Sequence, residues 1–126
     1  MKHILLVDSD LLFTTTITSL LQKEHFNVSV AKDGKEAAIA LAGKNFDLVI
    51  TDLFMPYSNG FELVNTIRQN KFTYIPVMVV SDVTKVQSIA NCFRLGADKY
   101  LQKPLNIPQL LSEIKSLVLN ERNVAA

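Results

Sequence analysis

The chain has 126 residues, which is enough for one domain with an ordinary hydrophobic core and too few for two. Thirteen Lys and Arg residues balance twelve Asp and Glu residues, so the net charge gives no indication of direct binding to nucleic acid or to a membrane. No apolar run approaches the about 20 residues of a membrane span, and the N-terminus has no signal-peptide pattern. The single cysteine, Cys92, lies in an apolar helical pattern, which predicts a buried structural thiol in a protein of the reducing cytoplasm.

Short apolar runs alternate with helical spacings along the whole chain. The apolar runs predict strands at 4–7, 28–31, 48–50, 77–80 and 98–102. Helical patterns predict helices at 11–24, 35–42, 61–67, 83–95 and 107–118. Gly43 and Gly96 are placed to end the second and the fourth helix, and Asp10 is placed to cap the first. Strands and helices are therefore expected in strict alternation.

This alternation predicts an α/β fold with a parallel sheet, because parallel strands need crossover connections and the right-handed crossover dominates. The expected architecture is a flavodoxin-like (βα)5 three-layer sandwich whose five strands have the order 2-1-3-4-5. Residues 1–122 are assigned to this domain, and residues 123–126 to a flexible tail or the start of a linker.

Four polar residues follow strands that are neighbours in the expected order: Asp8, Asp52, Ser81 and Lys103. Adjacent strands lie about 4.8 Å apart, so these side chains should form a row at the carboxyl edge of the sheet, where ligands of such folds bind. Three of these residues have plainer interpretations when taken alone: Asp52 as a turn residue, Ser81 as a helix cap, and Lys103 as half of a salt bridge.

Four segments together carry a resemblance to a known family: ILLVDSD, DLVITDLFMPYSNG, PVMVVSD and GADKYLQKPL. In this order and spacing they closely resemble the receiver domain of two-component response regulators, of the kind found in chemotaxis regulators. The resemblance covers nearly the whole chain. Each segment is weak evidence by itself, but each follows the strand that the family requires.

The resemblance implies that Asp52 accepts a phosphoryl group from the phosphohistidine of a sensor histidine kinase or a histidine phosphotransfer protein. Mg²⁺ would be held by Asp8, Asp52 and the backbone carbonyl of Phe54, while Ser81 and Lys103 would bind phosphoryl oxygens. These roles agree with the chemistry, because a carboxylate attacks a charged phosphoryl group only where cations neutralise the charge.

The family also implies a route for the signal. Tyr100 would follow Ser81 inward as an aromatic switch, although a half-buried strand tyrosine is the plainer interpretation. The fourth helix, fifth strand and fifth helix would then present a changed surface to a downstream effector protein or domain. A second copy of the chain, in a homodimer, is the other partner considered. Pro104 resembles the family's cis-proline. The protein would not be an enzyme, beyond catalysing its own phosphoryl transfer and a slow autodephosphorylation.

Two residues depart from the family pattern. Ser9 stands where most receivers have a second acidic residue that ligates Mg²⁺, and Asp82 stands where a small residue is usual. Both changes oppose phosphorylation, so a pseudo-receiver that acts only as a protein-interaction module is the alternative. A flavin-binding enzyme of the same architecture would need a hydroxyl- and glycine-rich phosphate loop, and the acidic residues after the first strand would repel a phosphate there.

Overall fold

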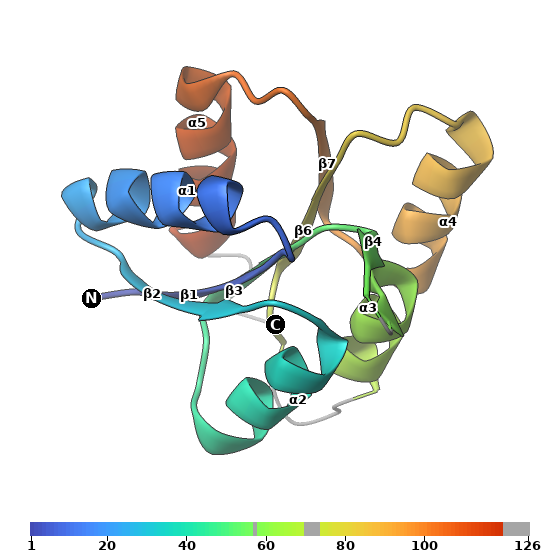
Figure 1. Cartoon of the computed structure of the whole chain (residues 1–126), viewed down its shortest axis with the longest axis horizontal. Helices are drawn as coiled ribbons and strands as arrows, with labels where there is room; N and C mark the ends of the chain where they lie inside the picture. The colour runs from blue at the N-terminus through green and yellow to red at the C-terminus, as the bar shows by residue number, and fades with distance from the viewer. Residues whose placement is uncertain (57, 70–73, 120–126) are drawn as a thin grey trace.

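The computed structural model describes residues 1–56, 58–69 and 74–119, and within them the predicted strands and helices follow in the predicted order, with two short strands added before the third helix (Figure 1). The helices are α1 (Leu11–Lys23), α2 (Gly34–Gly43), α3 (Gly60–Arg68), α4 (Val86–Leu95) and α5 (Ile107–Val118). The strands are β1 (His3–Val7), β2 (Asn27–Ala31), β3 (Leu48–Thr51), β4 (Phe54–Met55), β5 (Ser58–Asn59), β6 (Val77–Ser81) and β7 (Lys99–Gln102). The predicted boundary between residues 122 and 123 lies outside the described residues.

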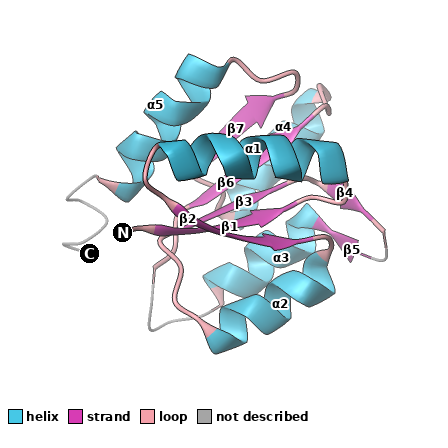
Figure 2. Ribbon diagram, turned by 60° about the vertical axis from the view of Figure 1, so that its left-hand side comes forward, coloured by secondary structure: helices cyan, strands magenta, loops and turns pink. Residues whose placement is uncertain are grey.

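Five of the strands form one parallel sheet in the order β2-β1-β3-β6-β7, which confirms the predicted order 2-1-3-4-5. Helices α1 and α5 cover one face of the sheet, and α2, α3 and α4 cover the other. Figure 2 shows α1 and α5 above the sheet and α2 and α3 below it. Strand β1 shows why both faces are apolar: Leu5 and Val7 pack with one helical layer, and Ile4 and Leu6 with the other. The three-layer sandwich is therefore confirmed.

Side-chain caps explain where four of the helices begin. Asp10, Asp33, Asn59 and Asn106 each accept a hydrogen bond from the backbone N–H group three residues later. The predicted capping role of Asp10 is thus confirmed. Cys92 is buried in the core, and burial raises the pKa of its thiol, as expected for a structural cysteine.

The prediction was wrong in two places near the carboxyl edge of the sheet. Helix α4 begins at Val86 and not at residue 83, and the Val83 carbonyl oxygen accepts the Tyr100 hydroxyl where a helix would have a backbone N–H group as donor. No strand was predicted between Asp52 and the third helix, but Phe54–Met55 and Ser58–Asn59 pair as a small antiparallel hairpin. Among the described residues, no helix has the length and apolar character needed to cross a membrane.

Candidate functional site

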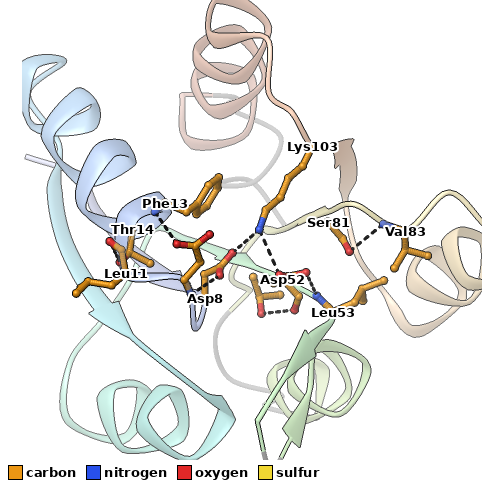
Figure 3. A network of polar contacts seen from close by, with 11 residues as sticks. Asp8, Leu11, Phe13, Thr14, Asp52, Leu53, Ser81, Val83 and Lys103 are labelled. Carbon is orange, nitrogen blue, oxygen red and sulfur yellow. Dashed lines mark hydrogen bonds and ion pairs between the residues drawn. The ribbon is translucent and has the colours of Figure 1, made fainter.

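The four predicted strand-end residues lie in a row at the carboxyl edge of the sheet (Figure 3). Asp8 directly follows β1 and Asp52 directly follows β3, and the Asp52 N–H group donates to the Val7 carbonyl oxygen at 3.0 Å. Lys103 follows β7 and reaches back across the edge. Its ammonium lies 2.8 Å from Asp8 Oδ2 and 3.3 Å from Asp52 Oδ2. One lysine therefore joins the ends of two strands that are separated from its own strand by β6.

Lys103 is the electrostatic centre of this site. Burial by itself would lower the pKa of the ammonium, but the hydrogen bond to Asp8 and the charges of Asp52 and Asp8 outweigh it, so the pKa is raised. Asp8 is only 3% exposed, and a buried carboxylate of this kind needs a partner. The two contacts keep Lys103 charged and give each carboxylate a cationic partner, although one ammonium balances only one of the two negative charges.

Backbone groups around Asp52 fix the direction of its carboxylate. The Leu53 N–H group donates to Asp52 Oδ1 at 2.7 Å, which leaves Oδ2 directed toward Lys103. Gly60 lies directly behind this turn, where a Cβ atom would come within 2.3 Å of the Asp52 carbonyl oxygen. The turn can therefore pack this closely against the start of α3 only with glycine at position 60.

The hydroxyl and the tyrosine predicted as a switch lie beside the same edge. Ser81 is fully buried, and its Oγ accepts a hydrogen bond from the Val83 N–H group at 3.3 Å. The Tyr100 hydroxyl donates to the Val83 carbonyl oxygen, and its ring is half-buried against the core on the α2, α3 and α4 face. Burial raises the pKa of Tyr100 most, and the charges of Asp52 and Asp82 add to the effect. Ser81 and Tyr100 are thus linked through one loop residue.

The residues predicted to hold Mg²⁺ suit a site with few protein ligands. Asp8 and Asp52 each place an oxygen against the same ammonium, so the two carboxylates face a common point. Mg²⁺ usually keeps several waters and takes one or two carboxylates, which this donor set can supply. The part of the chain that the structure describes has no cluster of three or more His, Cys, Asp or Glu side chains for a metal. The ligand role of the Phe54 carbonyl stays a prediction.

The two departures from the family pattern also have defined places. Ser9 is exposed, and the Asp10 carboxylate next to it accepts the Phe13 N–H group at 3.1 Å, as a helix cap does. Asp82 is exposed and lines a hollow that also contains Lys103. The structure therefore shows no third carboxylate turned toward Asp8 and Asp52 within the described residues.

Phe13 is a site residue that the sequence analysis missed. The Lys103 ammonium lies 4.2 Å from the centre of its ring. Phe13 stands four and eight residues before the buried Ile17 and Leu21, on the stripe of α1 that faces the sheet. That spacing could have identified Phe13 as the member of the stripe nearest to the carboxyl edge.

The topology is that of the flavodoxin-like fold of CheY-like proteins, with charged strand ends at its carboxyl edge. A profile of the response regulator receiver domain matches residues 4–115. The chain therefore belongs to the response regulator receiver family.

Curated relatives and solved structures agree with this assignment. The transcriptional regulatory protein CpxR of Klebsiella pneumoniae is 37% identical over 94% of this chain, and the match covers 50% of CpxR. The chain thus spans about half the length of such relatives. A two-component response regulator from Clostridium difficile has 25% identity and a TM-score of 0.90, with 95% of this chain and 98% of that chain covered. The response regulator TrrA of Thermotoga maritima, solved in complex with Mg²⁺ and BeF, has 30% identity and a TM-score of 0.83, with 93% and 99% covered.

Proposed function

We propose that this receiver domain is a phosphoryl-accepting signalling switch in which Asp52 takes the phosphoryl group. The observation that carries the proposal is the Lys103 ammonium shared between Asp52 and Asp8 at the sheet edge. The donor is the phosphohistidine of a sensor histidine kinase or of a histidine phosphotransfer protein. Asp52 forms a new O–P bond as the P–N bond breaks, and the imidazole leaves with the bonding electron pair.

The described side chains supply much of what this transfer needs. The Leu53 N–H group holds Asp52 in one orientation, so its carboxylate meets the donor in a defined direction. Lys103 would neutralise charge on one phosphoryl oxygen, and the Ser81 hydroxyl would donate a hydrogen bond to another. Mg²⁺, held by Asp8, Asp52 and the Phe54 carbonyl, would neutralise the remaining charge that develops on the phosphoryl oxygens.

Apart from its own phosphorylation and slow autodephosphorylation, we propose no catalytic activity. The domain would act in the cytoplasm, where the kinase presents its phosphohistidine. Neither nucleic acid nor a membrane is proposed as a direct partner of this domain, since its charges are balanced.

The second candidate function is a pseudo-receiver that binds proteins without efficient phosphorylation. Ser9 and Asp82 favour it, because one removes a carboxylate from the metal site and the other adds negative charge near the incoming phosphoryl group. A domain of this kind would keep the ion pairs of Lys103 as structural contacts.

A labelling experiment separates the two functions. Acetyl phosphate with Mg²⁺ should add one acid-labile phosphoryl group to the wild-type chain, as measured by intact mass. Asp52→Asn should abolish the addition, and Asp47→Asn, at a carboxylate before β3, should retain it. Label that survives Asp52→Asn would refute the assignment of the acceptor. A wild-type chain that takes no label, and whose amide spectrum does not change on addition of beryllofluoride and Mg²⁺, would be a pseudo-receiver.

For the output, we propose that the signal leaves through the face formed by α4, β7 and α5. Tyr100 on β7 bonds to the loop before α4, and Lys99 on β7 forms a 3.0 Å ion pair with Glu113 on α5. A change at Ser81 would reach all three elements through these contacts and alter binding of a downstream effector protein or domain, or of a second copy of the chain. Beryllofluoride with Mg²⁺ should change amide hydrogen exchange on this face. A change confined to α2 would contradict the proposed route.

A further inference from the structure

Three groups surround the Lys103 ammonium. Asp8 and Asp52 contact it through carboxylate oxygens at 2.8 and 3.3 Å, and the ring of Phe13 lies on another side at 4.2 Å from its centre. The face of an aromatic ring carries partial negative charge, so it attracts a cation and does not simply fill space. The ring and Lys103 also line a mostly apolar hollow with Ile17 and Leu105, and the exposed Asp82 lies at the same hollow.

The same carboxylate that holds the lysine also fixes the position of the ring. Asp8 Oδ1 accepts the Asp10 N–H group at 2.9 Å, and Asp10 Oδ1 accepts the Phe13 N–H group at 3.1 Å. Asp8 Oδ2 lies 2.8 Å from the Lys103 ammonium, as drawn in Figure 3. The same ammonium lies over the Phe13 ring, so the contacts form a closed circuit. The first turn of α1 is therefore set relative to the lysine by the carboxylate with which the lysine pairs.

We propose that Phe13 is a positioning residue for phosphoryl transfer, whose ring holds the Lys103 ammonium at the gap between Asp8 and Asp52. Lysine has a long stem with several rotatable bonds, and without a wall on this side its ammonium can swing out of the gap. An aliphatic residue of similar size would keep the packing but lose the attraction for the cation. The proposal rests on the proposed function of the domain, because Lys103 must meet the phosphoryl group for its position to matter.

Matched variants separate the effect of the aromatic ring from the effect of side-chain size. Phe13→Leu keeps an apolar side chain, Phe13→Tyr restores an aromatic face, and Leu12→Ala changes the neighbouring exposed residue as a control. In the metal-free wild type, the Lys103 Hε protons should show upfield chemical shifts from the ring current. Phe13→Leu should abolish the shift, while Phe13→Tyr and Leu12→Ala should retain it. Unshifted Hε protons in the wild type would overturn the proposed geometry, whatever the phosphorylation results.

Beryllofluoride binding in the presence of Mg²⁺ then tests the consequence for the site. Phe13→Leu should weaken binding about 2- to 5-fold, which corresponds to loss of a cation–π contact of 0.5–1 kcal/mol, and Phe13→Tyr should stay within about twofold of the wild type. Phe13→Met replaces Phe13→Leu if thermal melting shows the latter to be unfolded. Wild-type affinity in a folded aliphatic variant, or failure of the tyrosine to restore it, would overturn the positioning role. A wild type that does not bind beryllofluoride would refute the proposed function instead. The upfield shift of the Lys103 Hε protons would still support the contact between Lys103 and Phe13.

Discussion

Ser9→Asp should tighten Mg²⁺ binding, because it places a third carboxylate beside the buried Asp8. In the structure Ser9 is exposed, and the neighbouring Asp10 carboxylate is engaged as the cap of α1, so no residue replaces the missing charge there. A charge about 3 Å from the metal is worth several kcal/mol of gross attraction at an effective dielectric constant near 20. Dehydration and repulsion among the carboxylates cancel much of this. A net gain of about 1–3 kcal/mol remains, or about 5- to 150-fold in affinity.

Calorimetric titration with Mg²⁺ measures this gain, with Ser19→Asp, which adds the same charge to an exposed position farther along α1, as the control. Without metal, Ser9→Asp should lower the melting temperature by up to about 4 °C, because a partly screened repulsion costs at most about 1 kcal/mol. Equal Mg²⁺ affinities of the wild type and Ser9→Asp would refute this reasoning. They would mean that Asp10 or water already compensates for the serine when the metal binds.

Three further predictions concern other parts of the chain. A phosphorylated form should decay slowly, because the Phe54 side chain has no polar atom with which to orient an attacking water. The ring is 60% exposed, so we expect this lack of a polar atom, and not shielding of Asp52 from water, to slow hydrolysis. Phe54→Asn should speed the loss of label several-fold. Gly60→Ala should destabilise the fold by about 1–3 kcal/mol in urea unfolding and slow labelling of the acceptor, because its Cβ atom would clash with the acceptor turn. Gly43→Ala, where a Cβ atom meets nothing within 4 Å, should be nearly neutral. Finally, burial and a hydrogen bond from its hydroxyl to a carboxylate raise the pKa of Tyr74 to about 12, so the free energy of unfolding should fall as pH rises from about 10 toward 12. Tyr74→Phe should remove that part of the alkaline decline, and an unchanged pH profile would contradict it.

The sign of the last prediction follows from the protonation states. A folded-state pKa above the unfolded value of about 10 means that folding favours the neutral phenol of Tyr74. The stabilisation is therefore complete below pH 10 and is lost as the pH passes through the folded-state pKa.

Local chemistry was enough to predict most of the fold. The short apolar runs at 4–7, 48–50 and 77–80 fit strands buried on both faces, and the helical patterns between them fit the crossovers of a parallel sheet. The crossover rule then limited the strand order, and that order places Asp8, Asp52 and Lys103 at one edge of the sheet. The cap of α1 was equally local, because a side chain and a backbone group three residues apart decide it.

Only the tertiary structure decided what depends on distance between chain-remote groups. Helix α4 begins at Val86, and the Val83 carbonyl oxygen before it accepts the hydroxyl of Tyr100, 17 residues away, a contact that has no signature in the helical pattern. Likewise, the stripe of α1 could place Phe13 near the sheet edge, but not 4.2 Å from an ammonium that comes from the far end of the chain. Sequence periodicity fixes which face a residue occupies, whereas the meeting of a ring, a lysine and two carboxylates depends on how three strands and a helix pack together.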